Sequence, residues 1–155
     1  MVRAQGTEPV RARDEEAVST LVFHLGRELR TALDRRFESH GITSQQAALL
    51  LLSRLLKEPS PIKMAARLGT DAAGMTRLLD RLERKQFIAR RVSPDDRRLV
   101  VIELGPRSKH LLPRLVPEFK WAEKGLLDGF KKAEVDELNK MLRRLLQNAR
   151  RLNES

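Results

Sequence analysis

The sequence predicts a mainly α-helical fold that carries one small β-hairpin. Apolar residues recur at three- and four-residue spacing through most of the chain, which is typical of amphipathic helices. From about residue 87 to residue 104 this spacing gives way to two short runs of β-branched and aromatic residues around a Pro-Asp-Asp-Arg turn. Glycines and prolines cut the helical pattern into short segments in the middle of the chain and longer ones towards its ends.

Composition excludes several classes of site. The chain has 155 residues and no cysteine, which excludes disulfides, thiol redox sensing and thiolate metal ligands. It has no glycine-rich phosphate loop and no Gly-x-Ser-x-Gly motif, so we expect no enzyme activity and no cofactor. The N-terminus lacks the apolar core of a signal peptide, and the longest apolar run, residues 47–52, is far short of the roughly 20 residues that span a bilayer. We therefore expect a soluble, cytoplasmic protein that does not contact membranes.

The first long helix is expected after a flexible arm. Residues 1–13 mix glycine, proline, threonine and arginine without a period, which predicts the arm. From Asp14 to Phe37 the apolar residues follow helical spacing, and Gly41 is a strong signal for the end of this helix.

A second helix is expected to be buried. Thr43 and Gln46 have the spacing of a capping box, which opens a helix from Ala47 to about Leu56. Because this segment is apolar nearly all round, we expect it to lie in the core.

Two short helices separated by a turn follow the break at residues 58–61. The first is expected over residues 62–68 and is closed by Gly69. The second begins after a cap at Thr70 or Asp71 and extends to about Lys85.

The two sides of the second short helix differ in chemistry. The side expected to be buried carries Met75, Leu78, Leu79 and Leu82. The opposite side carries Ala73, Thr76, Arg77, Asp80, Arg81 and Arg84. Small, hydroxyl and arginine side chains on one exposed side allow a close approach to DNA bases and hydrogen bonds to base edges and phosphates. Taken alone, the same pattern also fits an ordinary amphipathic surface helix.

The hairpin is predicted from Phe87 to Ser93 and from Leu99 to Leu104, with its turn at residues 94–97. A helix-turn-helix followed by such a β-wing is an arrangement that holds DNA. Arginines at a thin hairpin tip can enter a minor groove, where the potential is most negative. The alternative is a solvated tip, for which charged residues are normal.

The C-terminal part is expected to be helical in two segments. The first, residues 107–129, contains Pro113 and Pro117, so we expect either a kink or a helix that begins near Pro117. The second carries a long apolar stripe after Gly129, formed by Val135, Leu138, Met141, Leu142, Leu145, Ala149 and Leu152.

The positive charge is concentrated in the middle of the chain. The net charge is +10, and residues 54–114 hold 15 basic and 7 acidic residues, a net +8. Residues 1–53 are neutral overall, and residues 115–155 carry only +2. Most of the excess therefore coincides with the helix-turn-helix and the hairpin, as expected for a surface that binds phosphates.

Four motifs together resemble the MarR family of winged-helix transcriptional regulators. They are Gly41-Ile-Thr-x-x-Gln46, Ala65-x-x-Leu68, Met75-Thr-Arg-Leu-Leu-Asp-Arg-Leu-Glu83 and Asp96-Arg-Arg-x-x-x-x-x-Leu104. The resemblance extends from about residue 14 to the C-terminus. It implies a homodimer with intertwined terminal helices, whose two winged-helix lobes straddle a pseudo-palindromic operator in double-stranded DNA.

The resemblance also assigns roles to residues. Base recognition in the major groove is expected from Ala73, Thr76 and Arg77, and the minor-groove contact from the wing tip at Arg97 and Arg98.

Supporting roles follow in the same way. The resemblance implies that Asp96 orients the wing by pairing with a nearby arginine, and that Lys63, Arg90 and Arg91 contact phosphates.

Three features depart from the family pattern. Gln86 replaces the glycine that usually links the recognition helix to the first strand, and in a left-handed conformation it would carry strain of roughly 1–2 kcal/mol. Gly105-Pro106 replaces the threonine that usually caps the following helix, and the two prolines inside that helix are atypical.

The apolar stripes at the two ends of the chain predict a dimer interface. They could pack on each other within one chain, but we expect them to be shared with a second copy. The residues expected in this interface are Val18, Leu21, Leu25, Leu138, Leu142 and Leu145.

The resemblance further implies a small aromatic or anionic effector. Candidate pocket residues are His24, Phe37, His40 and Trp121, for which plain packing is the alternative. A zinc site would need His40 and His110 with Glu38, but no two histidines have helical ligand spacing, so we expect no metal.

These observations predict a sequence-specific DNA-binding regulator, most simply a repressor. Residues 41–106 would form the DNA-binding lobe, and residues 14–40 and 107–155 the helical dimerisation region, in one compact unit overall. The alternatives are an architectural protein that binds DNA without sequence preference and a winged helix that binds acidic protein partners.

Overall fold

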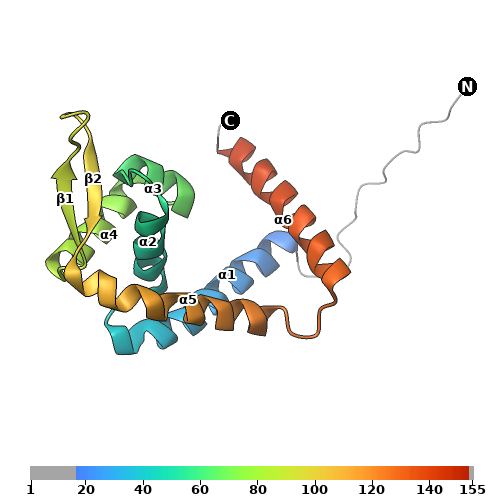
Figure 1. The fold of residues 1–155 in the computed structure, drawn as a ribbon. Coiled ribbons are helices and arrows are strands. Elements are labelled where there is room, and N and C mark those ends of the chain that lie inside the picture. The colour runs from blue at the N-terminus through green and yellow to red at the C-terminus, as the bar shows by residue number, and fades with distance from the viewer. Residues whose placement is uncertain (1–16, 154–155) are drawn as a thin grey trace, which may run out of the picture. The chain divides into compact units, whose positions relative to one another are not determined.

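The computed structural model describes residues 17–153 of the chain, and Figure 1 shows their helices and the single hairpin. The chain divides into two units, one extending to Ser44 and the other beginning at Gln45. The predicted flexible arm at residues 1–13 and the predicted first residues of the long helix, 14–16, lie outside the described residues.

The first unit contains α1 (Val18–Phe37) and the short 3-10 helix η1 (Glu38–His40). Gly41 ends this helical stretch with a left-handed φ of 68°, which confirms the predicted stop signal. The Asp34 carboxylate accepts a hydrogen bond from the backbone N–H of Ser44 at 2.6 Å and so joins α1 to the residue that begins the next helix.

Helix α2 (Ser44–Leu55) begins directly after Thr43. This is three residues before the predicted start at Ala47, since the first three residues after the cap of a capping box already lie in the helix. Ala47, Leu49 and Leu50 are completely buried, so the predicted core position of this helix is confirmed.

Helices α3 (Pro61–Leu68) and α4 (Ala72–Arg84) form the predicted helix-turn-helix. The Ser60 hydroxyl caps α3, and Gly69 ends it with a φ of 63°. The Asp71 carboxylate caps α4 by accepting from the backbone N–H of Gly74 at 2.5 Å, which decides between the two predicted caps.

Strands β1 (Ile88–Val92) and β2 (Val100–Leu104) form the hairpin. They pair antiparallel, with Ile88 opposite Leu104 at the base and Val92 opposite Val100 near the tip. Only Ile102 of β2 is fully buried, and its backbone N–H donates to the Pro59 carbonyl at 2.7 Å. The hairpin is therefore held to the helices by Ile102 in the middle of β2 and by the buried Ile88 at its base, while its tip extends away from the helices (Figure 1).

Helix α5 (Pro106–Leu126) runs without interruption past both internal prolines. The alternative start near Pro117 is therefore wrong. Each proline removes one helical hydrogen bond. The carbonyls that lose their partners belong to Lys109 and Pro113, which are both exposed, so water can reach them.

Helix α6 (Lys132–Leu152) follows Gly129, which has a φ of 81°. None of the residues of α6 is buried. The predicted apolar stripe on this helix is thus exposed or half-buried in the single chain.

The core of the second unit draws on every element from α2 to α5. Its fully buried members are Leu49, Leu50, Met64, Met75, Leu79, Leu82 and Leu115, and the hairpin adds Phe87, Ile88 and Ile102. The expected buried stripe of α4 is confirmed at three of its four positions, and Leu78 is half-buried. Over the described part of the chain, no helix combines the length and the apolar character that a transmembrane segment needs.

Candidate nucleic-acid interface

The outward side of α4 carries the predicted base-reading residues. Ala73, Thr76 and Arg77 are all exposed, while Met75 and Leu79 on the opposite side are buried. The amphipathic pattern alone orients the helix in this way, because the apolar side must face the core.

Thr76 and Arg77 offer complementary hydrogen-bonding groups. The Thr76 hydroxyl donates to the Ala72 carbonyl at 2.9 Å, so its oxygen remains an acceptor for an exocyclic amino group of a base. The Arg77 side chain makes no hydrogen bond or ion pair with any residue in the range 17–153. Its guanidinium can therefore donate two parallel hydrogen bonds, as guanine recognition requires.

The hairpin tip is ordered by its own backbone and by a buried serine. The Ser93 hydroxyl accepts from the backbone N–H groups of Asp95 and Asp96 at 3.3 and 3.4 Å, and its backbone N–H donates to the Leu99 carbonyl at 2.8 Å. Ser93 is only 3% exposed. The sequence prediction missed this residue, although a serine directly before Pro-Asp-Asp is a common local turn signal.

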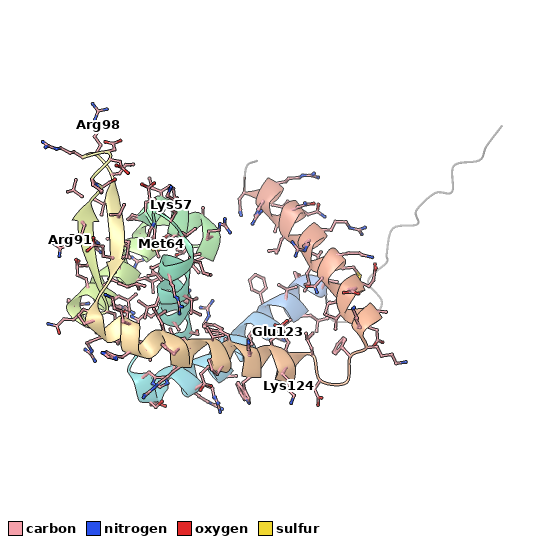
Figure 2. All side chains as sticks on the ribbon, viewed as in Figure 1. Lys57, Met64, Arg91, Arg98, Glu123 and Lys124 are labelled. Atoms are coloured by element: carbon pink, nitrogen blue, oxygen red, sulfur yellow. The ribbon has the colours of Figure 1, made fainter. Side chains whose placement is uncertain are left out.

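Asp96 orients the tip, but by a different contact from the predicted one. Its carboxylate accepts a hydrogen bond from the backbone N–H of Arg98 at 2.9 Å and forms no ion pair with an arginine among the described residues. A carboxylate two residues before an amide can close this local turn without ordering a long side chain. The Arg97 and Arg98 side chains are left exposed, and Figure 2 shows Arg98 extending from the tip.

Arg90, predicted to contact a phosphate, is paired with two carboxylates of the protein in this structure. Its guanidinium contacts the Asp80 carboxylate at 2.5 Å and the Glu83 carboxylate at 3.2 Å, and its backbone N–H donates to Glu83 at 3.1 Å. Its side chain is 30% exposed. Arg90 therefore ties β1 to α4, because two acids one helical turn apart face the strand that returns beside the helix.

The other two predicted phosphate ligands are exposed but paired. Arg91 contacts the Glu103 carboxylate across the hairpin at 3.2 Å, and Figure 2 shows its side chain on the outer side of β1. Lys63 donates to the Glu58 carbonyl at 3.3 Å, with the Glu58 carboxylate at 3.8 Å. Exposed pairs of this kind contribute little to stability, so both cations can exchange partners.

The residues predicted for an effector pocket differ in exposure. Phe37 is completely buried, which fits the packing alternative, whereas His40 is half-buried and His24 and Trp121 are exposed. An open hollow of about 320 Å³ lies along α1, between Val22 and Asp34, and none of the four candidates lines it. No cluster of three or more metal-ligating side chains occurs in the described segment.

The residues predicted for a dimer interface are accessible in the single chain. Val18, Leu21 and Leu25 on α1 are each about half exposed. On α6, Leu142 and Leu145 are exposed and Leu138 is half-buried.

Comparison with known proteins places this arrangement in a family. Residues 42–100, which contain α2 to α4 and most of the hairpin, match the model of the MarR family. The HTH-type transcriptional repressor YetL of Bacillus subtilis is 27% identical over 78% of this chain and 74% of its own length. The transcriptional repressor MprA of Escherichia coli is 26% identical over 85% of this chain and 76% of its own.

The fold agrees with this assignment. The crystal structure of the S. aureus MepR–DNA complex superposes with a TM-score of 0.81 at 24% identity, covering 86% of this chain and 99% of the MepR chain. The family match, the two relatives and the winged helix with its outward arginines lead to one conclusion. Residues 42–100 are a MarR-family domain, and the chain is a transcriptional regulator.

Proposed function

We propose that the protein is a homodimeric repressor that binds a pseudo-palindromic operator. Helix α4 of each copy would enter the major groove, with Thr76 and Arg77 at base edges, and Arg98 would enter the minor groove. Bound in this way, the dimer would block access of RNA polymerase to the promoter.

The proposal rests on the difference between an arginine that is paired within the protein and arginines that are not. Arg90 is held by two carboxylates inside the lobe, whereas Arg77, Arg97 and Arg98 are exposed, with side chains that contact no partner in the described residues. An exposed guanidinium that no protein group engages has all five donors available for bases and phosphates.

The exposed apolar side chains on α1 and α6 support the dimer. A helix such as α6, with leucines at positions 138, 142 and 145 and no buried residue, is stabilised by packing only when another surface covers it. A second copy of the same chain is the simplest such surface, and a twofold axis would then duplicate α4 for the two operator half-sites.

The names of the relatives YetL and MprA support repression. Release by a small aromatic or anionic effector is the remaining part of the proposal. By linkage, such a molecule must bind more tightly to the conformation in which the two lobes do not fit the operator.

The test begins with the DNA beside the gene, because regulators of this kind often control their neighbours. An inverted repeat that the protein protects from nuclease would supply the operator. Fluorescence anisotropy then compares this duplex with a scrambled duplex for the wild type, Arg77→Ala and, as a control for lost charge, Arg114→Ala on the exposed side of α5. We expect Arg77→Ala to weaken operator binding about 10-fold or more and scrambled binding much less.

Two other outcomes would favour the alternative functions. An equal loss on both duplexes would indicate an architectural protein without sequence preference. No binding to any duplex at moderate salt would indicate a winged helix that uses its basic side on acidic proteins.

A further inference from the structure

Arg107, in the first turn of α5, contacts the C-terminal end of the recognition helix α4, and we call this contact the Arg107 grip. The Arg107 guanidinium donates to the Lys85 carbonyl at 2.8 Å and lies over the Phe87 ring, 4.7 Å from its centroid. Lys85 is the C-terminal cap of α4, and Phe87 is buried. Arg107 therefore satisfies a carbonyl that α4 itself cannot pair, and it places a positive charge at the negative end of the helix dipole.

Two residues near Arg107 in the sequence also contact the link after α4, through the Phe87 carbonyl. The backbone N–H of Gly105 donates to the Phe87 carbonyl at 2.8 Å, and the buried Ser108 hydroxyl donates to the same oxygen. A Cβ added at Gly105 would lie 2.6 Å from the Gln86 carbonyl oxygen, so only glycine allows this contact. The link at residues 85–87 is thus held by the N-cap residue of α5, Gly105, and by Arg107 and Ser108 in its first turn.

The Arg107 grip connects α4 directly to α5, two helices that are otherwise joined along the chain only through the hairpin. Along the sequence, α4 reaches α5 by way of β1, the tip and β2. Through Arg107, the end of α4 is joined to α5 directly. Helix α5 in turn leads to α6, whose exposed apolar side chains belong to the proposed dimer interface.

We propose that Arg107 is a positioning residue for operator binding. By joining the end of α4 to α5, it makes the position of α4 depend on that of α5. This inference rests on the proposed function, because it matters only when two copies of α4 must fit two half-sites at once. Arg107 comes three residues after the base of the hairpin, where Ile88 pairs with Leu104, and the paired strands extend roughly 13 Å from there towards the tip. It acts through α4 and does not contact DNA.

Positioning has a different signature from a phosphate contact. An operator requires both recognition helices at a fixed separation, whereas non-specific DNA tolerates a range of separations. Loosening the grip should therefore reduce operator affinity selectively. Loss of a phosphate contact weakens binding to all sequences and lowers the salt slope by about 1.

The experiment compares Arg107→Ala with Arg114→Ala, which removes the same charge from an exposed position of the same helix. Anisotropy titrations at several salt concentrations use the operator and a scrambled duplex. We expect Arg107→Ala to weaken operator binding about 5- to 30-fold, with the salt slope and the scrambled-duplex affinity unchanged. Arg114→Ala should change operator binding less than about 2-fold.

Hydrogen exchange of the free protein provides a readout that is independent of DNA. Arg107→Ala should accelerate exchange of the Gln86 and Phe87 amides, which close the end of α4, while Arg114→Ala should not. An unchanged operator affinity, or a parallel loss on both duplexes with a reduced salt slope, would overturn the inference. Failure of the wild type to prefer any operator would instead overturn the proposed function, and the exchange result would still report on the grip.

Discussion

Two adjacent arginines of β1, Arg90 and Arg91, have different partners and different exposure. Successive residues of a strand point to opposite sides, so Arg90 faces α4 and Arg91 faces outward. Arg90 there meets Asp80 and Glu83, whereas Arg91 meets only the exposed Glu103. The same residue type at two adjacent positions thus links β1 to α4 at Arg90 and forms an exposed surface cation at Arg91.

This difference predicts unequal costs for the two alanine substitutions. Arg90→Ala leaves the Asp80 and Glu83 carboxylates, one helical turn apart on α4, without their shared cation, and it should lower the free energy of unfolding by about 1–2 kcal/mol. Arg91→Ala removes an exposed pair and should cost less than about 1 kcal/mol. Urea denaturation of both variants measures the difference, and equal costs would contradict the tie between β1 and α4.

Gln86 stores strain at the end of α4. Its φ of 61° lies in the left-handed region, so the departure from the family glycine is a genuine one. The conformation persists because the Gln86 and Phe87 N–H groups bond to the Glu83 and Leu82 carbonyls, each at 2.9 Å.

Replacing Gln86 by glycine should release this strain. We expect Gln86→Gly to raise the free energy of unfolding by about 0.5–1 kcal/mol, since the relief exceeds the added entropy of the unfolded chain. Ala66→Gly on the exposed side of α3 is the control and should lower it by about 1 kcal/mol. Thermal denaturation distinguishes the two signs, and a destabilised Gln86→Gly would show that the side chain itself holds the turn.

At the scale of elements, the junction of hairpin and α5 depends on close backbone approach. Gly105 has an ordinary φ of −73°, so glycine is required there because there is no room for a side chain and not because of the backbone conformation. Gly125 in the same helix has no atom near the place of a Cβ.

These two glycines give a matched pair of substitutions. Gly105→Ala should lower the free energy of unfolding by about 1–3 kcal/mol, because the new methyl group overlaps the Gln86 carbonyl and must displace backbone. Gly125→Ala should raise it by about 0.5–1 kcal/mol through helix propensity. Chemical denaturation measures both, and a neutral Gly105→Ala would mean that α5 can move away from residues 85–87 without cost.

At the scale of the whole molecule, the exposed side chains of α6 predict association. Wild-type protein should sediment at twice the chain mass at micromolar concentration. Leu145→Asp places a charge in the proposed interface and should weaken the dimer 100-fold or more, at a cost of roughly 3 kcal/mol. Asn139→Asp adds the same charge at an exposed polar position and should leave the dimer intact. A wild-type monomer at that concentration would contradict the dimer.

Local chemistry made much of the fold and of the site predictable from the sequence. Gly41, Gly69 and Asp71 end or begin helices because of what their own backbone or side chain permits, and the structure has them in those roles. The exposure of Thr76 and Arg77 followed in the same way, from a helical period that assigns one side to the core.

Only the tertiary structure decided which polar groups are already engaged. The partners of Arg90, Ser93 and Arg107 come from other elements or from the detailed path of a turn, and neither charge nor spacing along the chain reveals them. The continuous course of α5 past Pro117 was decided in the same way, because a proline's cost is set by whether water reaches the freed carbonyl. The sequence by itself thus determined which segments are helices and strands, to within a few residues at their ends, and which part of the chain is basic, since these depend on neighbours within a few residues. The fold determined which arginines hold the lobe together and which remain exposed, since that depends on residues brought together from different elements.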